Sequence, residues 1–246
     1  MSTAHEGEEH KMTQQQSVIV TGGTGGLGTA VTALLLDKGW RVVVPWIAEA
    51  EVERLAEHSS NPNLVLTQAD LFDTESTETV AALGAADPTA PLTALVNLVG
   101  GFAMGPRVHE SPIGDFEHQL NLNLRPTYAM SAAAIPHLIT SGGGSIVAMS
   151  TKAASAPFAG ASGYVTAKAG VLSLVAALAV EYKKDRIRAN VLMPTVIDTP
   201  GNRAGQPDAD RSNWVAPERI AQVIAFLVGP DSEAISGAQI PLPGVG

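Results

Sequence analysis

A glycine-rich segment placed between a strand pattern and a helix pattern constrains the fold most. TGGTGGLG occupies residues 21–28, directly after the apolar run VIV and before a helical pattern over residues 29–38. This context is typical of the first strand–helix unit of a dinucleotide-binding sheet. There Gly22 permits the tight turn, Gly26 lets a pyrophosphate approach the backbone, and Gly28 lets the helix pack close to the strand. The segment therefore predicts a phosphate site at a helix N-terminus.

Short apolar runs alternate with helical patterns from residue 17 onward. Continuous apolar strands that alternate with helices predict a parallel sheet covered on both faces. We expect one Rossmann-type, doubly wound α/β domain over residues 17–246, and a disordered tail over residues 1–16, which carry no apolar periodicity. The expected strands span 18–20, 41–44, 63–70, 94–100, 145–150, 188–194 and 238–243, and the expected helices span 29–38, 52–57, 116–138, about 163–184 and 217–227.

Charge and residue usage exclude several classes of protein. A net charge of −9 without a basic cluster makes nucleic acid and anionic membranes poor partners. The longest apolar stretch, Val171–Val180, is too short to span a bilayer, and the polar N-terminal segment is unlike a secretory signal, so we expect a cytoplasmic protein. The chain has no cysteine, and its histidines show no metal-ligand spacing with carboxylates, so we expect neither a disulfide nor a metal site.

Tyr164 and Lys168 lie four residues apart within an expected helix, in the segment GYVTAKAG. Residues at this spacing lie on the same helix face. An ammonium beside a phenol favours the phenolate, which moves the tyrosine pKa from near 10 toward a range useful in acid–base catalysis. The pair therefore predicts a proton-transfer site.

The end of the second expected strand bears on the choice of dinucleotide. An Asp or Glu there accepts a hydrogen bond from the ribose 2′-hydroxyl, whereas an Arg holds a 2′-phosphate. This chain has Trp46 and Ile47 at that place, with Glu49 and Glu51 just beyond. The two carboxylates would repel a phosphate, which favours NAD(H), with NADP(H) as the alternative. Trp46 itself either packs under the adenine or belongs to a local core.

Two polar residues end the next strands. Asp70 is placed to accept a hydrogen bond from an adenine amino group, or else to cap a helix. Asn97 is placed to tie neighbouring strands together under the cofactor, or else to form a turn before Gly100 and Gly101.

In order and spacing, these segments resemble the short-chain dehydrogenase/reductase family from about Ser17 to the C-terminus. The matching pieces are TGGTGGLG, Asp70, NLVG, QLNLNL, SIVAMST, YVTAK, Asn190 with MPTVIDTP, and AQIPLPG. The resemblance implies an NAD(P)-dependent oxidoreductase that transfers a hydride between nicotinamide and a small carbonyl or alcohol substrate.

The resemblance also implies residue roles. Tyr164 is the general acid/base, Lys168 binds the nicotinamide ribose and lowers the tyrosine pKa, and Asn123 links Lys168 to a proton-relaying water. The family's serine precedes its tyrosine by thirteen residues, which places the hydroxyl at Thr151, with Ser150 as the alternative. Thr199 contacts the nicotinamide amide. The full set of implied cofactor contacts is Gly22, Thr24, Gly26, Leu27, Gly28, Trp46, Asp70, Leu71, Asn97, Val99, Gly100, Tyr164, Lys168, Pro194, Val196 and Thr199.

A narrower resemblance lies in residues 194–214, which are similar to a segment of dihydropteridine reductases and related bacterial reductases. This segment is expected to form a lid over the substrate. Reduction of a quinonoid pteridine is therefore one alternative function, and a non-catalytic nucleotide sensor is another.

The helix after Tyr164 is apolar nearly all round, which indicates burial on both sides. In the family this helix pairs with its two-fold copy, so we expect a homo-oligomer, a tetramer or a dimer. The candidate contacts are Leu172, Val175, Ala176 and Ala179.

Overall fold

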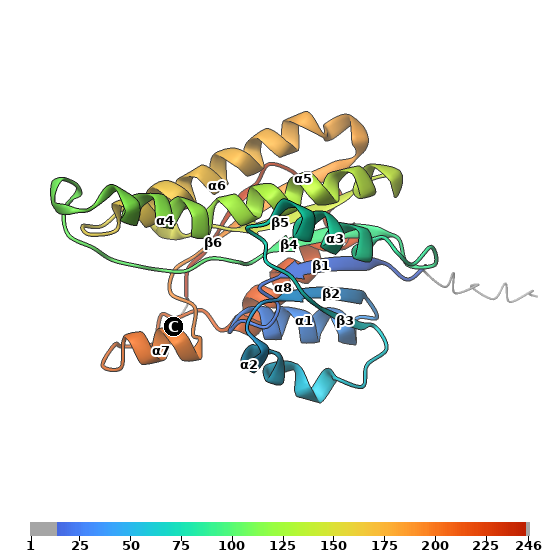
Figure 1. Ribbon diagram of the computed structural model, residues 1–246, viewed down its shortest axis with the longest axis horizontal. Helices are drawn as coiled ribbons and strands as arrows, with labels where there is room; N and C mark the ends of the chain where they lie inside the picture. Colours follow the sequence, from blue (N-terminus) through green and yellow to red (C-terminus); the bar gives the residue numbers. More distant parts are fainter. Residues whose placement is uncertain (1–13, 245–246) are drawn as a thin grey trace, which may run out of the picture.

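The computed structural model describes residues 14–244, in which a single parallel sheet forms the centre (Figure 1). Most of the expected tail, residues 1–13, lies outside the described residues. The seven strands follow the order β3-β2-β1-β4-β5-β6-β7, and every neighbouring pair is parallel. The predicted Rossmann-type fold class is confirmed. The strands are β1 Ser17–Thr21, β2 Arg41–Trp46, β3 Leu64–Gln68, β4 Leu92–Asn97, β5 Gly144–Met149, β6 Ile187–Pro194 and β7 Gln239–Leu242.

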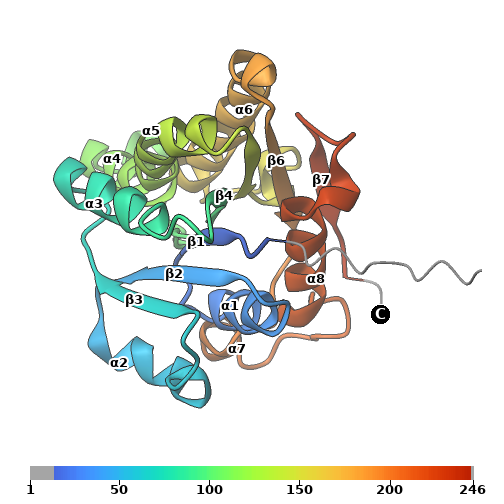
Figure 2. The ribbon, with the colours of Figure 1, turned by 90° about the vertical axis from the view of Figure 1, so that its right-hand side faces the viewer.

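Helices cover both faces of the sheet (Figure 2). One layer consists of α1 Gly28–Asp37 and α8 Pro217–Val228, which pack against each other, with the short α2 Glu49–Val52 beside them. The other layer consists of α3 Thr74–Gly84, α4 Ile113–Asn123, α5 Arg125–Thr140 and α6 Ser162–Glu181. A last short helix, α7 Pro200–Gly205, lies beyond the ends of the strands.

Alternate residues of a strand belong to two separate hydrophobic cores, because successive side chains point to opposite faces of the sheet. Val18 and Val20 of β1 pack on the side of α1 and α8, whereas Ile19 packs on the side of α3, α5 and α6. All three are fully buried. The continuous apolar runs in the sequence reflect this two-sided burial.

Several helices differ from the sequence expectations. The expected helix over 52–57 is the end of α2 followed by a 3-10 helix over Glu53–His58, and α7 was not expected. Helix α3 was not expected; Asp73 caps its N-terminus, and the Asp73 carboxylate accepts a hydrogen bond from the Ser76 backbone N–H. The expected helix over 116–138 is in fact α4 and α5, separated at Leu124. Pro126 lies in the first turn of α5, a position that proline tolerates well because its missing N–H would have no partner there.

Helix α6 is the one helix among residues 14–244 that is long and apolar enough to cross a membrane. In the structure it packs against β6 and α4 instead. Its buried side includes Val171, Val175 and Leu178. Val175 is only 1% exposed, so the expectation that it contacts a partner subunit is wrong.

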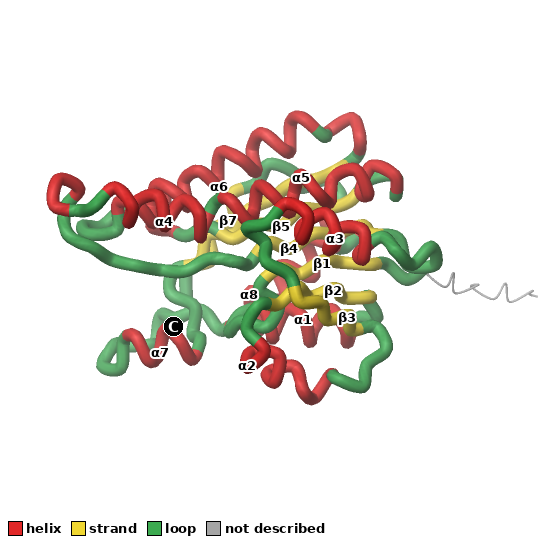
Figure 3. The backbone as a smooth tube through the Cα atoms, in the orientation of Figure 1, coloured by secondary structure: helices red, strands yellow, loops and turns green. Residues whose placement is uncertain are grey.

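The strand order reverses between β1 and β4. From β1 the chain continues to β2 and β3 on one side, and from β4 to β5, β6 and β7 on the other. Thr21 and Asn97, the last residues of β1 and β4, are register partners. The loops that follow the strands gather at one end of the sheet, on the left in Figure 3. In open α/β sheets, the crevice at such a reversal is where ligands bind.

Candidate active site

A cavity of about 1220 Å³ opens at this crevice. It is bordered by the glycine turn, by the loops that follow β2 to β6, and by α7. It brings together most of the site residues expected from the sequence. The expected residues that line it are Gly22, Thr24, Gly26, Leu27, Gly28, Trp46, Asp70, Leu71, Val99, Gly100, Ser150, Thr151, Tyr164, Lys168, Pro194 and Val196.

The glycine turn is packed so closely that its glycines cannot carry side chains. Gly22 has a φ of +67°, and a Cβ there would lie 3.2 Å from the backbone nitrogen of Val99. A Cβ on Gly28 would collide with the Gly22 carbonyl oxygen. This open backbone at the start of α1 is a cradle that fits the pyrophosphate of a dinucleotide.

Thr199 does not line the cavity. Its hydroxyl oxygen accepts a hydrogen bond from the Asn202 backbone N–H and so caps α7. A Cβ on Gly26 would lie 2.9 Å from the Cβ of Thr199. Thr199 therefore packs α7 against the glycine turn, and its contact with nicotinamide stays a prediction.

The structure adds an acidic residue to the end of the cavity beside β2. Glu51, at the end of a short helix after Trp46, lines this end. Its carboxylate accepts hydrogen bonds from the Thr24 hydroxyl at 3.3 Å and from Arg54 at 3.1 Å. Arg54 also donates to the backbone carbonyl of Thr24 at 3.1 Å. The sequence showed an acid near Trp46, but only the fold shows that Glu51, and not Glu49, reaches the glycine turn.

Asp70 and Asn97 have different environments. Asp70 is exposed at the cavity, and its carboxylate accepts a hydrogen bond from the Phe72 backbone N–H. The helix cap considered for Asp70 belongs to Asp73 instead. Asn97 is buried below the cavity and does not line it; its amide donates to the Ser131 hydroxyl at 3.3 Å. Asn97 thus ties β4 to α5.

The two candidate hydroxyls differ in what they contact. The Ser150 hydroxyl donates to the backbone carbonyl of Lys168 at 2.8 Å. The Thr151 side chain contacts Tyr164 and accepts a hydrogen bond from the Ala153 backbone N–H at 3.3 Å. The geometry thus places the Thr151 hydroxyl beside the tyrosine, whereas the Ser150 hydroxyl is committed to the helix.

Lys168 is buried at the base of the cavity. Its ammonium donates to the backbone carbonyl of Met149 at 3.0 Å. Asn123 is fully buried and accepts from the Gly101 backbone N–H at 3.0 Å, whereas Asn121 is exposed. A Cβ on Gly100 would lie 2.7 Å from Asn123 Oδ1 and 2.9 Å from Lys168 Nζ, so the ends of both side chains lie close to Gly100.

Burial controls the protonation of the pair. It raises the pKa of Tyr164, and the contact with Thr151 acts in the opposite direction. It lowers the pKa of Lys168 to about 8. The spacing of the pair in the sequence predicts that Lys168 lowers the pKa of Tyr164. The structure differs because desolvation of the phenolate is the largest effect and the ammonium is turned to the Met149 carbonyl.

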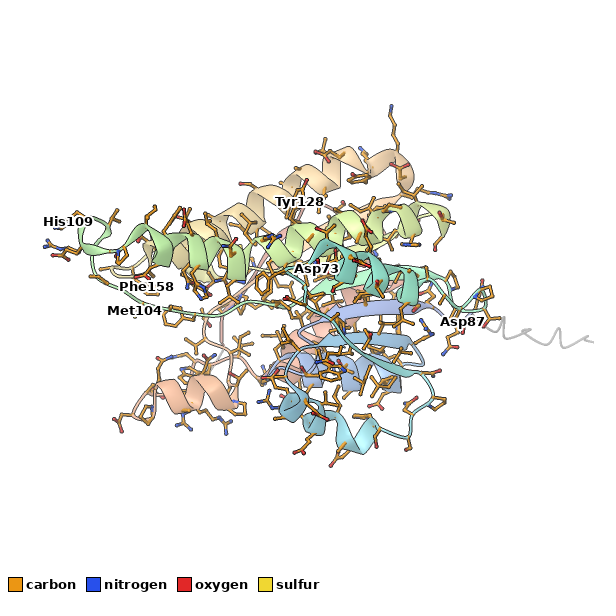
Figure 4. The ribbon with its side chains drawn as sticks, viewed as in Figure 1. Asp73, Asp87, Met104, His109, Tyr128 and Phe158 are labelled. Carbon is orange, nitrogen blue, oxygen red and sulfur yellow. The ribbon has the colours of Figure 1, made fainter. Side chains whose placement is uncertain are left out.

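The wall beside Tyr164 is aromatic. Phe102 meets the Tyr164 ring edge-on, with centroids 5.1 Å apart, and Phe158 lies 6.2 Å from Phe102. Met104 and Phe158 lie on neighbouring loops at this end (Figure 4). The segment expected to form a lid supplies Ile197, Asn202 and several further cavity residues.

Comparison with known proteins agrees with this geometry. Residues 16–210 match the family model described as "short chain dehydrogenase". The chain is 29% identical over 241 residues to 2-(R)-hydroxypropyl-CoM dehydrogenase of Xanthobacter autotrophicus, with 92% of this chain and 96% of that protein covered. It is 30% identical over 242 residues to cis-4-hydroxycyclohexanecarboxylate dehydrogenase of Sinomonas cyclohexanicum, with 94% and 96% covered.

A solved structure described as "short chain dehydrogenase/reductase family protein" is also similar. It has a TM-score of 0.83 and 29% identity, and the match covers 94% of this chain and 97% of that one. The structure titled "ElxO with NADP Bound" has a TM-score of 0.84 at 22% identity, with 92% and 96% covered, and supports the fold. The chain therefore belongs to the short-chain dehydrogenase family of NAD(P)-dependent oxidoreductases.

Proposed function

We propose that this protein interconverts a small carbonyl compound and its alcohol, with Tyr164 as the general acid/base. The observation that carries the proposal is the shared cavity: Tyr164, Thr151 and Lys168 line the same space as the glycine turn. The two relatives described above are named as dehydrogenases of hydroxy compounds, which agrees with this substrate class.

Each polar residue has a task that follows from its contacts. The Tyr164 hydroxyl donates its proton to the substrate oxygen during reduction and accepts it during oxidation. Its raised pKa keeps it protonated at neutral pH, which suits the acid. The Thr151 hydroxyl beside it positions the substrate oxygen. We assign Lys168 to the nicotinamide ribose, because it lines the same cavity as Tyr164, and Asn123 holds the loop that covers Lys168.

A bound dinucleotide would supply or accept the hydride, and the residues that line the cavity would hold it and orient its reactive face. Its phosphates fit the backbone cradle at the start of α1. We assign the ribose-reading role to Glu51 because its carboxylate lies beside the glycine turn and accepts a hydrogen bond from Thr24. A carboxylate there favours NAD(H) over NADP(H).

Replacement of Tyr164 by phenylalanine tests the assignment, because it keeps the ring and removes only the transferable proton. General acid–base catalysis contributes roughly 10²–10⁴-fold, so kcat on a panel of carbonyl compounds should fall at least about a hundredfold while the dinucleotide still binds. Tyr128→Phe is the matched control, because that ring is 62% exposed on α5. Retention of most activity by Tyr164→Phe would contradict the proposal.

The same panel separates the alternatives. A quinonoid pteridine substrate requires Tyr164 and Lys168 but not a hydroxyl partner, so a Ser150→Ala, Thr151→Ala double variant would retain pteridine reduction while losing carbonyl reduction. A nucleotide sensor would bind NAD(H) without turnover of any compound.

A further inference from the structure

The charged side chains around the cavity are unevenly distributed. The acids Glu51 and Asp70 lie at the end beside β2 and β3, next to Trp46. At the other end, next to Tyr164, the charged residues that line the cavity within 14–244 are Lys168 and Lys152. Lys168 is committed to the Met149 carbonyl, so Lys152 is the cation left for a ligand.

Other basic side chains near the cavity already have partners. Arg54 pairs with Glu51 at 3.1 Å, and Arg203 makes two contacts with Asp198, at 2.6 and 2.7 Å. Within residues 14–244, by contrast, the Lys152 ammonium takes part in no hydrogen bond or ion pair; only its backbone carbonyl is used, in the short turn after Thr151. In a protein with net charge −9, this lysine is exposed, lines the cavity and directly follows Thr151, which contacts Tyr164.

The cavity wall beside Tyr164 is apolar and partly exposed to solvent. Phe102 is 53% exposed and Phe158 is 47% exposed, although both have apolar neighbours in the fold. Exposed aromatic rings that line a cavity mark a binding surface for an apolar group. Their faces and edges suit a flat ring.

We propose that the substrate is amphipathic: a flat apolar ring that carries the reacting carbonyl or alcohol, and an anionic group, such as a carboxylate, that pairs with Lys152. The ring packs against Phe102 and Phe158 while the carbonyl oxygen meets Tyr164. This inference rests on the proposed oxidoreductase function, because it takes Tyr164 as the point where the carbonyl lies.

The first test compares two ring ketones of the same shape, 4-acetylbenzoate and its neutral amide, 4-acetylbenzamide. Wild type should show a higher kcat/KM for the benzoate, and Lys152→Gln should lower the benzoate-to-benzamide ratio by roughly tenfold, since a charge-assisted contact is lost. Lys152→Arg should restore much of the ratio. Lys184→Gln, an exposed lysine in the turn after α6, is the control and should keep it.

A second test reads binding without turnover. Calorimetric titration of Tyr164→Phe, saturated with NADH, should show tighter binding of 4-acetylbenzoate than of 4-acetylbenzamide, and a Lys152→Gln change in that background should remove the difference. Equal affinities, or no binding of either compound, would overturn the inference. Preferential binding in this titration without turnover by wild type would instead count against the proposed function alone.

The aromatic wall is tested with a saturated comparison compound, cyclohexyl methyl ketone. Phe158→Leu should raise KM for acetophenone more than for the cyclohexyl ketone, with little change in kcat, because Phe158 does not touch Tyr164 directly. Phe226→Leu is the control, since that ring is 44% exposed on α8 and does not line the cavity. An equal change in KM for the two ketones would contradict the wall's role.

Discussion

The Ser150 hydroxyl donates a 2.8 Å hydrogen bond to the backbone carbonyl of Lys168. In return, the Lys168 ammonium donates to the backbone carbonyl of Met149 at 3.0 Å. These two bonds join the end of β5 to α6. They fix where the residues that follow β5 lie relative to the helix that carries Tyr164, and they leave Thr151, one residue later, beside the tyrosine ring.

We expect the two neighbouring hydroxyls to behave differently when they are removed. Ser150→Ala loses a buried hydrogen bond and leaves a carbonyl without it, so the free energy of unfolding should fall by about 1–3 kcal/mol. Thr151→Ala should lower kcat strongly while the free energy of unfolding changes little. Thr151→Ser should retain activity. Urea unfolding and steady-state kinetics on the three variants check this. A larger loss of kcat in Ser150→Ala than in Thr151→Ala would reverse the assignment.

Burial of Lys168 makes stability depend on pH. Its pKa is about 8 in the fold against 10.5 as the ordinary value, so the unfolded chain binds more protons between these two values. The resulting cost, about 3 kcal/mol, is fully present below pH 8 and is relieved as the pH rises to 10.5. The stability of Lys168→Met relative to wild type should therefore decrease over this range. Urea unfolding at pH 7, 8, 9 and 10 measures it, and a constant difference would contradict the assignment.

The fold could be predicted from the sequence because its two signals, the apolar runs and the glycine turn, are both local. Seven apolar runs and one glycine turn lie where the sequence analysis placed them, within a few residues. Helix α3 was missed because TESTETVAALG has few apolar residues before Val80, and its burial depends on packing against α5. Pro126 indicates the break between α4 and α5, but the helical pattern that continues on both sides of it favoured a single helix.

The candidate site was less predictable where it depends on distance through space. Spacing alone places Tyr164 and Lys168 on one helix face, but not the burial that raises one pKa and lowers the other. The contact of Glu51 with Thr24 joins helix α2 to the glycine turn, which are far apart in the sequence. For the same reason, no local pattern shows that Thr199 packs against Gly26.

Gly100 should not tolerate a side chain. A Cβ there would lie within 3 Å of both Asn123 Oδ1 and Lys168 Nζ, so Gly100→Ala must displace two buried polar groups. We expect kcat to fall by at least about tenfold, since small displacements of positioned groups reduce rate strongly. Gly114→Ala is the control, because nothing lies within 4 Å of a Cβ at that position on α4. Equal activity of the two variants would contradict the prediction.

Glu51 should set the choice of dinucleotide. Wild type should bind NADH at least as tightly as NADPH, and Glu51→Gln should shift the ratio toward NADPH severalfold, because the variant removes a charge that repels the 2′-phosphate and releases Arg54. Glu49→Gln is the neighbouring control. Calorimetric titrations with both dinucleotides check this, and a tenfold preference of wild type for NADPH would overturn it.

The exposed side of α6 should mediate assembly. Ala176 and Ala177 are exposed on it, and Val180 is 77% exposed, which leaves an apolar surface next to the buried Val175. We expect a homo-oligomer, a tetramer or a dimer, that Ala176→Glu dissociates. Light scattering at micromolar concentration gives the mass, and a monomeric wild type would contradict the prediction.

The two ends of the sheet are built differently. At the amino ends of the strands, the Arg41 guanidinium donates to the Ser17 hydroxyl and to the backbone carbonyls of Leu83 and Gly84, which closes that end with bonds between chain segments. The opposite end consists of loops around a cavity. Substitutions in those loops can therefore change which molecule is accepted while the closed end preserves the framework, so new substrate preferences can evolve in this protein at little cost to its stability.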